Sequence, residues 1–351
     1  MHHYGQRSNM NFSRKFERAL ITGIKGSGAS YLAEEIVFNH PEVGVHGIAR
    51  WHSTDTTNRN LRNVADKITI HDCDLMDLSR VIAVVKDIKP DVIFHLASHS
   101  NVKTSFLYPL AVMQNNVMGT ANLLEALRIT ECNPIFITIS TSEVYGIVRQ
   151  EDTPIGEKHP IQPVNPYAVS KLAQDALSYA YHMSYGLNVI RTRAFTYLNP
   201  RRHDIFATSF ARQVVEIELG LRDMLWYGNL DSTRTIIDVR DCMRAYWVAA
   251  TMGYIGEVYN IGGRTIMSVD QFLGLLKDNA KCKIKAAIDP DLLRPVDVTM
   301  QIPNTTKFEK HTGWSPQYSF EDSVKFFLEE VRRDVCHENQ INYEDKYGPD
   351  R

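Results

Sequence analysis

A glycine-rich turn between a short apolar run and a helical pattern is the feature that most constrains this chain. Residues 18–22 are suited to a buried strand, and residues 30–38 have the apolar spacing of a helix. The turn reads GIKGSGA, a G-x-x-G-x-x-A pattern that ends at Ala29. Such glycines let backbone N–H groups approach a pyrophosphate at the positive end of a helix dipole. The turn predicts a dinucleotide site with contacts from Gly23, Lys25, Gly26, Ser27 and Gly28.

Strand and helix patterns alternate after this turn. Further strands are expected at 43–49, 67–71, 91–96, 134–139 and 187–193, and helices at 78–86, 112–129 and 166–185. This alternation implies a parallel sheet covered on both faces. We therefore predict an α/β fold with a doubly wound parallel sheet of the Rossmann type.

The alternation becomes irregular after Arg193, which predicts a smaller, discontinuous C-terminal substrate-binding lobe. The Rossmann domain is expected at 18–193, and about 233–255 should return to it through a strand at 235–239. The lobe would comprise 194–232 and 256–335 and cover the carboxyl ends of the strands, where ligands bind. Residues 1–17 and 336–351 are polar, and we expect an N-terminal extension and a loosely attached tail.

Charge and cysteine usage exclude several classes of partner. The chain has 351 residues and a formal net charge of -2, with both signs interspersed, so neither nucleic acid nor a membrane surface is an expected partner. The five cysteines are scattered singly, which indicates a reducing compartment. Residues 1–17 lack the apolar core of a signal peptide, and no apolar run is long enough to span a membrane. We predict a cytoplasmic protein with a small charged ligand.

The end of the second strand bears on which dinucleotide binds. An Asp or Glu there holds the ribose of NAD, whereas an Arg accommodates the 2′-phosphate of NADP. This chain has Arg50 and no carboxylate in GIARWHS, so NADP is favoured over NAD. Asp74 and Leu75 follow the third strand, where they would border the adenine. His95 and His99 straddle a strand end rather than sharing a helix face, so no metal site is expected.

Two polar clusters supply candidate chemistry. Tyr167 and Lys171 form a Y-x-x-x-K pair on one face of a helix, where the lysine favours the phenolate that takes a proton from a substrate hydroxyl. The run STSEVYG follows the fifth strand at the edge where substrates bind. In it, Thr141 could donate a hydrogen bond to a sugar oxygen and Glu143 could act as base or acid.

The motifs TGxxGxxA, STSEVYG and NPYAVSK together resemble the extended short-chain dehydrogenase/reductase family that acts on nucleotide sugars. The similarity covers about residues 18–335. Within that family, ALITGIKGSGASYLAE, VHGIAR and NPRR are most similar to the GDP-mannose 4,6-dehydratases. GNLDSTRTIIDVRD and LLRPVDV are at least as similar to a sister group, the GDP-4-keto-6-deoxymannose reductases.

The resemblance implies roles for individual residues. The catalytic set would be Thr141, Glu143, Tyr167 and Lys171. Further cofactor contacts would be Leu96, Ala97, Ser98, Ser100 and Arg202, in addition to Tyr167 and Lys171. Substrate contacts would be Ser105, Thr196, Arg234 and Arg294, with the two arginines on the nucleotide diphosphate. Thr196, Tyr197 and Phe210 depart from residues usual in the family, which affects the expected substrate more than the reaction type.

The implied activity is that of an NADP-dependent nucleotide-sugar 4,6-dehydratase, a lyase that oxidises C4, eliminates water across C5 and C6 and regenerates its cofactor. A GDP-sugar is the favoured substrate, and relatives often form dimers or tetramers through the helices that follow the fourth and fifth strands.

Four alternatives remain. A keto-sugar reductase needs Tyr167 and Lys171 but can work without a C5 base. A C4 epimerase usually lacks the glutamate. A decarboxylase needs an arginine for the sugar carboxylate, and no position in the sequence can be assigned to it. A non-catalytic dinucleotide sensor would have lost the proton-transfer residues.

Overall fold

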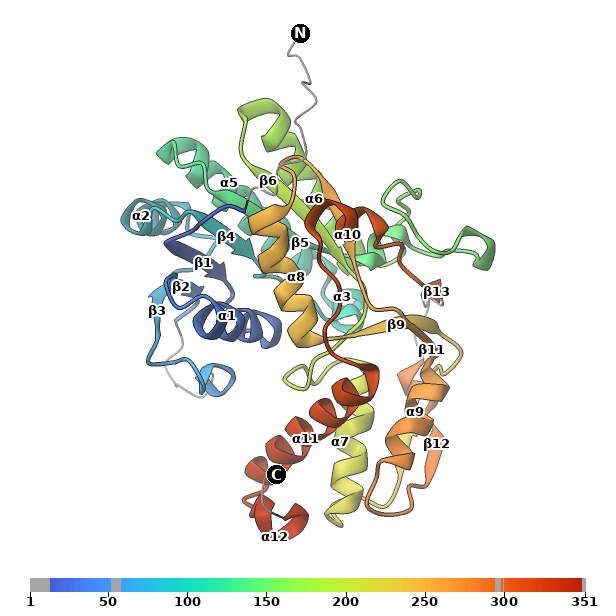
Figure 1. Ribbon diagram of the computed structural model, residues 1–351. Coiled ribbons are helices and arrows are strands. Elements are labelled where there is room, and N and C mark those ends of the chain that lie inside the picture. The colour runs from blue at the N-terminus through green and yellow to red at the C-terminus, as the bar shows by residue number, and fades with distance from the viewer. Residues whose placement is uncertain (1–12, 52–57, 294–297, 299, 349–351) are drawn as a thin grey trace.

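A parallel sheet of seven strands forms the centre of the larger domain (Figure 1). The computed structural model describes residues 13–51, 58–293, 298 and 300–348. The strand order is β10-β6-β5-β4-β1-β2-β3. The strands are β1 (Arg18–Thr22), β2 (Gly44–Ala49), β3 (Ile68–Asp72), β4 (Val92–His95), β5 (Ile135–Thr141), β6 (Val189–Ala194) and β10 (Val258–Ile261). From β1 to β3 the strands are added toward one edge of the sheet, and from β4 onward they are added toward the other edge. A doubly wound fold binds its ligand at this switch point, between β1 and β4. The predicted fold class is confirmed.

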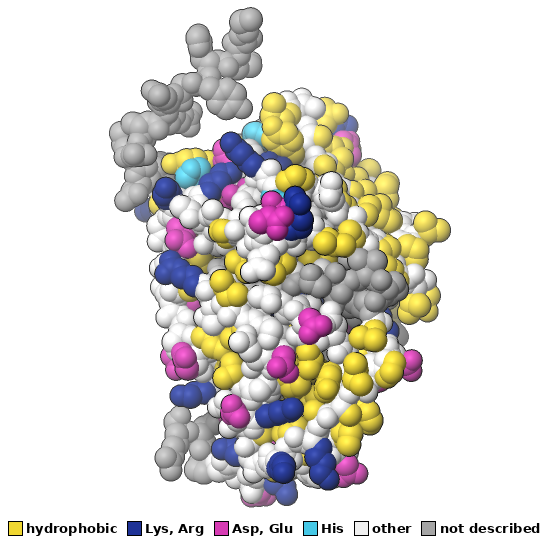
Figure 2. Space-filling model, turned by 90° about the vertical axis from the view of Figure 1, so that its right-hand side faces the viewer, with side chains coloured by type: hydrophobic (Ala, Val, Ile, Leu, Met, Phe, Trp, Pro, Cys, Tyr) yellow, Lys and Arg dark blue, Asp and Glu magenta, His cyan; other side chains and the backbone are white. Residues whose placement is uncertain are grey.

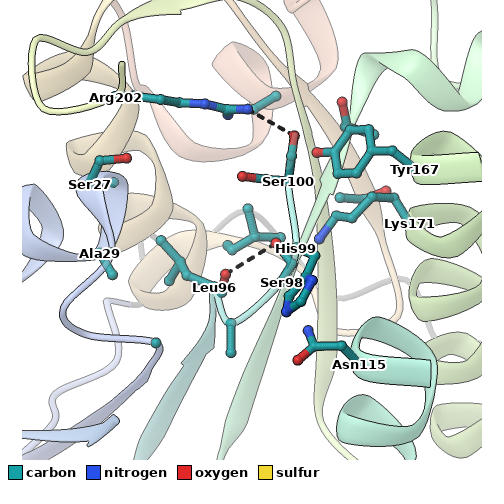
Figure 3. Close-up of a pocket in the computed structure, with 18 of the residues that line it drawn as sticks. Ser27, Ala29, Leu96, Ser98, His99, Ser100, Asn115, Tyr167, Lys171 and Arg202 are labelled. Carbon is teal, nitrogen blue, oxygen red and sulfur yellow. Dashed lines mark hydrogen bonds between the residues drawn. The ribbon is translucent and has the colours of Figure 1, made fainter. Parts of the chain in front are cut away.

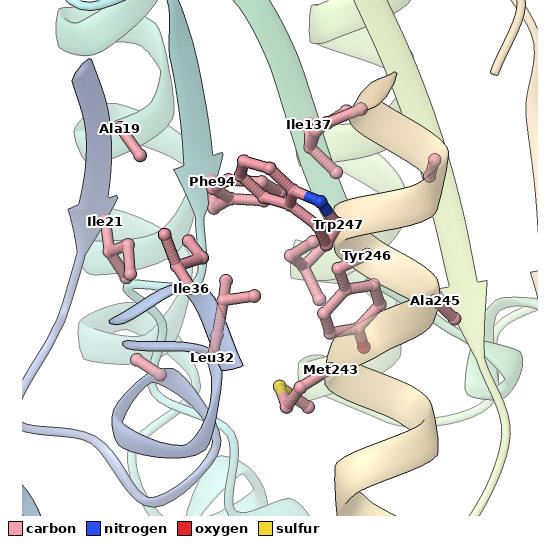
Figure 4. Close-up of a cluster of buried hydrophobic side chains, with 14 of the residues drawn as sticks. Ala19, Ile21, Leu32, Ile36, Phe94, Ile137, Met243, Ala245, Tyr246 and Trp247 are labelled. Atoms are coloured by element: carbon pink, nitrogen blue, oxygen red, sulfur yellow. The ribbon is translucent and has the colours of Figure 1, made fainter. Parts of the chain in front are cut away.

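Helices cover both faces of this sheet. One face carries α1 (Ser27–Asn39) and α8 (Val239–Met252), whose Trp247 and Met243 pack toward Phe94 and Ile21 (Figure 4). The other carries α2 (Leu78–Ile88), α5 (Gly119–Thr130) and α6 (Pro166–Tyr185). Successive residues of a strand point to opposite faces, so Leu20 joins the core beneath α2 and Ile21 the core beneath α1. This double burial explains why the central strands β1 and β4 are nearly continuous apolar runs.

The smaller lobe has its own sheets and core, and it lies at the lower end of the molecule in Figure 1. Its larger sheet joins β9 (Thr233–Asp238) to β7 (Tyr197–Leu198), β11 (Thr265–Ser268) and β13 (Met300–Gln301), and its smaller one pairs β8 (Leu225–Tyr227) with β12 (Ala286–Ile288). The helices that enclose its core are α7 (Phe206–Glu218), α9 (Val269–Asp278) and α11 (Phe320–Glu338).

Short helices complete the described chain. They are η1 (Asn58–Leu61), α3 (Val102–Leu107), α4 (Pro109–Met113), the π-helix η2 (Gln114–Met118), η3 (Ser142–Tyr145), η4 (Gln150–Asp152), η5 (Pro290–Leu292), α10 (Thr306–Thr312) and α12 (Tyr343–Tyr347). The helix expected at 112–129 therefore contains a π turn. On the face shown in Figure 2, acidic and basic side chains are interspersed, in line with the near-zero net charge.

The expected strand at 235–239 was wrong in its placement. That segment forms β9, which pairs with β7, β11 and β13 of the lobe and not with the main sheet. The edge position beside β6 is filled instead by β10, which the sequence had assigned to the lobe. From the expected returning segment 233–255, α8 follows β9 directly and packs on the face of the Rossmann sheet.

The polar C-terminal segment is not loosely attached over its described part. Cys336 is buried at the end of α11, and the Tyr347 hydroxyl donates to the Glu218 carboxylate at 2.8 Å. Near the N-terminus, Phe16 is buried against Trp247, while residues 1–12 lie outside the described residues. Among the helices that the structure describes, none has the length and apolarity needed to cross a bilayer.

Candidate active site

A cavity of about 480 Å³ runs from the glycine turn past the ends of β4 and β5 to the lobe (Figure 3). The lobe contributes Phe206, Arg234 and Gln301 to its wall. Most of the residues proposed from the sequence line it. They are Gly23, Lys25, Gly26, Ser27, Gly28, Arg50, Asp74, Leu75, Leu96, Ala97, Ser98, Ser100, Thr141, Glu143, Tyr167, Lys171, Thr196, Arg202 and Arg234.

The backbone of the glycine turn leaves room for a phosphate. Gly23 has a φ of +68°, and a Cβ there would lie 2.9 Å from the Cα of Ala97. Gly26 is the N-cap of α1 and supplies no side-chain cap, so the first N–H groups of α1 face the cavity without one. A dinucleotide pyrophosphate fits this arrangement, because it would accept hydrogen bonds from those N–H groups.

Replacing Gly23 with Ala should weaken NADP⁺ binding by at least about tenfold, because the added methyl group displaces the Ala97 backbone, which lines the cavity proposed for the cofactor. The left-handed conformation should also cost about 1–2 kcal/mol of stability. Calorimetric titration with NADP⁺ and thermal unfolding measure the two effects. Gly274→Ala is the matched control, since no atom lies within 4 Å of its added Cβ. Unchanged affinity in Gly23→Ala would contradict this role for the turn.

The adenosine side of the cavity carries the residues proposed to select NADP. Arg50 follows β2 directly and is exposed at the cavity, and Asp74 and Leu75 also line its wall. The sequence after Trp51 up to residue 57 lies outside the described residues. Arg50 is therefore the described cavity residue that directly follows β2, and its positive charge suits a 2′-phosphate.

Tyr167 and Lys171 lie in the first turns of α6, where both side chains point into the cavity (Figure 3). Asn165 caps this helix by accepting a hydrogen bond from the Ala168 N–H at 2.8 Å. Burial raises the pKa of Tyr167, while the charge of Arg202 and a hydrogen bond with Thr141 oppose that rise. Burial lowers the pKa of Lys171 to about 7, against the effect of Asp175. The positive charge of Arg202 therefore favours the phenolate form of Tyr167. The sequence argument had depended on Lys171 for this effect.

Glu143 lies in η3 directly after β5, with one amide donor on each carboxylate oxygen. Asn165 Nδ2 donates to Oε2 at 3.0 Å, and Gln301 Nε2 donates to Oε1 at 3.1 Å. Thr141 caps η3 by accepting from the Glu143 N–H at 3.3 Å. The sequence did not single out Asn165 or Gln301. Asn165 had a signal as the first residue of NPYAVSK, whereas no motif marked Gln301.

His95 belongs to a buried hydrogen-bond network behind the site. Its Nδ1 lies 2.8 Å from the Thr22 hydroxyl oxygen, and its Nε2 lies 2.8 Å from the Thr120 hydroxyl oxygen. The side-chain amide of Gln174 contacts the same imidazole ring. Burial lowers the pKa of His95 to about 3, so the ring is neutral at physiological pH. The network joins β1, β4, α5 and α6 at the sheet's carboxyl edge. In the part of the chain that is described, no three His, Cys, Asp or Glu side chains are grouped to hold a metal ion.

Three residues from the sequence analysis lie away from the cavity or outside the described part. Ser105 is fully buried in α3, where its hydroxyl donates to the Val102 carbonyl at 2.7 Å, and it does not line the cavity. Phe210 is buried in the lobe core. Arg294 lies outside the described residues.

The lobe side of the cavity holds the remaining substrate candidates. Arg234 lines it, and its guanidinium donates to the Val298 carbonyl at 3.3 Å. Tyr197 lies against the glycine turn, since a Cβ at Gly28 would be 3.2 Å from its hydroxyl. Burial raises the pKa of Tyr197 to about 12. Asn115 and Tyr246 also line the cavity, and the sequence had not pointed to either.

A family model described as GDP-mannose 4,6 dehydratase matches residues 20–326, which include every strand of the main sheet except the first two residues of β1. The chain belongs to the GDP-mannose 4,6 dehydratase family. A GDP-mannose 4,6-dehydratase of Yersinia enterocolitica is 31% identical over 344 residues, which cover 87% of this chain and 91% of the relative. A GDP-6-deoxy-D-mannose reductase of Pseudomonas aeruginosa is 32% identical over 241 residues, covering 68% of this chain and 79% of the relative.

Solved structures place the same family in a wider fold group. The RMD of Pseudomonas aeruginosa complexed with NADPH has a TM-score of 0.79 and 26% identity, and the match covers 91% of this chain and 99% of that one. DesIV of Streptomyces venezuelae, a dTDP-glucose 4,6-dehydratase with NAD and TYD bound, has a TM-score of 0.78 and 25% identity over 92% of this chain and 98% of its own. The predicted resemblance to nucleotide-sugar enzymes is confirmed at the level of family and fold.

Proposed function

We propose that this chain is an NADP-dependent nucleotide-sugar 4,6-dehydratase that acts on a GDP-sugar. The observation that carries this proposal is the Glu143 carboxylate, which lines the same cavity as Tyr167 and Lys171. A base beside the tyrosine is what water elimination requires and what simple oxidation or reduction at C4 does not. Membership of the GDP-mannose 4,6 dehydratase family supports the same conclusion.

The described residues suit an NADP cofactor. The N–H groups at the start of α1 would bind its pyrophosphate, and Arg50 would bind the 2′-phosphate. Leu96, Ala97, Ser98, Ser100 and Arg202 line the adjoining wall of the cavity. When bound, NADP supplies reversible hydride acceptance, which makes oxidation at C4 and reduction at C6 one closed cycle.

Tyr167 acts first, as the base that takes the C4 hydroxyl proton. Its deprotonated form is favoured by the charge of Arg202 and by the Thr141 hydrogen bond. The resulting C4 ketone makes the proton on C5 acidic. Thr141 lies where its hydroxyl can hold a sugar oxygen during this step.

Glu143 then takes the C5 proton, and the C6 hydroxyl leaves with a proton as water. Because Glu143 gains one proton from C5 and can give one to the departing oxygen, the residue ends the step in its original ionised state. Return of the hydride to C6 requires a proton at C5, which balances the proton that Tyr167 took from the C4 hydroxyl. The sugar then has lost one water without net oxidation.

Substrate recognition is proposed for the lobe side. Arg234 and Arg294 would bind the diphosphate through their guanidinium groups, with Thr196 nearer the sugar. Phe210 belongs to the lobe core and does not line the cavity, so no role in nucleotide binding is assigned to it. Ser105 likewise could act on substrate only through the α3 backbone that its hydroxyl holds.

A second candidate is a nucleotide 4-keto-6-deoxy-sugar reductase. It is favoured by the 32% identity to the Pseudomonas aeruginosa reductase and by the structural match to an NADPH complex. The two functions differ in stoichiometry. A dehydratase consumes no reductant, whereas a reductase oxidises one NADPH for each sugar.

Incubating the purified chain with a panel of nucleotide sugars and no added reductant should give loss of one water from a GDP-sugar by mass spectrometry, with no net change in NADPH. Turnover of only a keto sugar, with stoichiometric NADPH consumption, would replace the dehydratase with the reductase. Release of an isomer of unchanged mass would indicate an epimerase.

Assembly into a homodimer or homotetramer is also proposed. Exposed apolar side chains are concentrated on α3, α4 and α6, where Leu107, Leu110 and Met183 are 67%, 81% and 58% exposed. Such a surface is typical of a symmetric interface. Sedimentation velocity should show a dimer or larger species that Leu110→Glu dissociates and that Ile266→Glu, at an exposed position on β11, leaves intact. A monomeric wild type would contradict this.

The cytoplasmic location stays a prediction.

A further inference from the structure

Gln301 reaches the active site from a distant part of the chain. It is 3% exposed on β13, in the lobe, whereas its partner Glu143 follows β5 of the Rossmann domain. The two residues are 158 positions apart, and their side chains meet at 3.1 Å. With Asn165 on the other oxygen, the carboxylate is held between an amide from each domain.

The strand that carries Gln301 is fixed by contacts on both sides. In the lobe sheet, Gln301 lies in register with Arg234 of β9, which lines the cavity. Beyond it, the Ile155 N–H donates to the Ile302 carbonyl at 2.7 Å, and the Asn304 N–H donates to the Ile155 carbonyl at 2.8 Å. The backbone that carries the Gln301 side chain is therefore held on one side by the strand of Arg234, the cation proposed for the diphosphate, and on the other by the loop that follows η4.

Orientation matters for a carboxylate that removes a proton from carbon. A glutamate side chain has three rotatable bonds, and a displacement of about 1 Å at a reacting group can cost about 100-fold in rate. One donor would leave the carboxylate free to turn about that contact. Two donors, one on each oxygen, fix its plane as well as its position.

We propose that Gln301 is a positioning residue for Glu143, which orients the carboxylate for removal of the C5 proton and makes that orientation depend on the lobe strand paired with Arg234. This inference rests on the proposed dehydratase function. In this role Gln301 acts through its hydrogen bond to Glu143 and not on the reacting carbon itself.

The kinetic test compares Gln301→Leu with Gln213→Leu. Gln213 is a matched control because it is also a nearly buried lobe glutamine, with its amide bonded to the Trp226 backbone at 2.8 and 3.0 Å. Rapid-mixing absorbance of the reduced nicotinamide follows C4 oxidation, and mass spectrometry follows water loss. Both are measured together with KM.

In Gln301→Leu, the rate of water loss should fall by about tenfold or more, while C4 oxidation and KM change by less than about twofold. Gln301→Glu should lower water loss further, because it places a second carboxylate against Glu143. Gln213→Leu should lower the unfolding temperature without altering the ratio of the two rates. Equal loss of both rates in Gln301→Leu, or no loss, would overturn the proposal.

A second measurement is independent of the reaction. Thermal unfolding is compared for the wild type, Gln301→Leu, Glu143→Ala and the double variant. If the side chains interact, the double variant should lose less in unfolding temperature than the sum of the two single losses. Additive losses would overturn the proposal whatever the chain catalyses. The wild type could also release no water while the losses in unfolding temperature are non-additive. That result would overturn the proposed function but leave the Gln301–Glu143 contact supported.

Discussion

Glu143→Gln should reduce water loss by about 10²- to 10⁴-fold while C4 oxidation continues, because the amide keeps the size of the side chain and removes the base. The variant should therefore accumulate a 4-keto sugar that keeps its C6 hydroxyl, together with bound reduced cofactor. Mass spectrometry of the quenched reaction separates this species from the dehydrated product. The expected result depends on Glu143 lining the cavity with both carboxylate oxygens held.

Glu157→Gln provides the control for this variant. Glu157 accepts a hydrogen bond from the Asn260 N–H at 3.0 Å and does not line the cavity. The same chemical change there should leave both steps at the wild-type rate. Elimination at the normal rate in Glu143→Gln would remove the residue from the mechanism, and a parallel loss of C4 oxidation would give it a different role.

Tyr167→Phe should abolish C4 oxidation, with a fall of about 10²- to 10⁴-fold in kcat, because no other group in the proposal takes the C4 hydroxyl proton. Water loss should disappear with it, since C5 is acidic only after the ketone forms. Stopped-flow absorbance of the reduced nicotinamide measures the first step. The variant should still bind NADP⁺, which calorimetry checks.

Tyr145→Phe is the corresponding control. The Tyr145 hydroxyl is buried and donates to Asn260 Oδ1 at 2.8 Å, outside the cavity. The same hydroxyl accepts from the buried Arg193 guanidinium at 3.0 Å, so its loss should lower stability by about 1–3 kcal/mol while C4 oxidation stays unchanged. If Tyr145→Phe and Tyr167→Phe lowered the rate equally, the effect of Tyr167 would be structural rather than catalytic.

The pKa of Tyr167 determines how the rate of C4 oxidation should change with pH. Burial raises the pKa of Tyr167, and Arg202 and Thr141 only partly oppose that rise. Because the deprotonated form is the base, the rate of C4 oxidation should increase with pH toward this raised pKa and fall as the phenol is protonated. A pH–rate profile that fell toward alkaline pH over the same range would contradict this assignment.

Much of the site could be predicted because its residues lie in local patterns. The glycine turn, the polar end of β5 and the Tyr167–Lys171 pair are each set by neighbours within a few positions, and the sheet order brings these segments to one edge. Ser105 was proposed by resemblance alone, and its buried hydroxyl, bonded inside α3, does not line the cavity.

The lobe was harder to predict, because its sheets are short and join distant segments. β9 and β10 are both short strands that mix polar and apolar residues, yet one pairs with β11 of the lobe and the other with β6 of the main sheet. Composition does not distinguish two such strands. The choice depends on which edge each can reach after the preceding helix or turn, and that is a property of the folded chain.

The sequence by itself determined the strand–turn–helix unit at 18–39, the Rossmann fold class and the residues proposed for proton transfer, because strand and helix periodicity and turn chemistry act over short separations. Only the tertiary structure placed Gln301 on Glu143 and Arg202 near Tyr167. The first contact crosses 158 positions and exists because β13 pairs with β9 in one register. A one-residue slip in that pairing would turn the amide to the opposite face of the strand, away from the carboxylate.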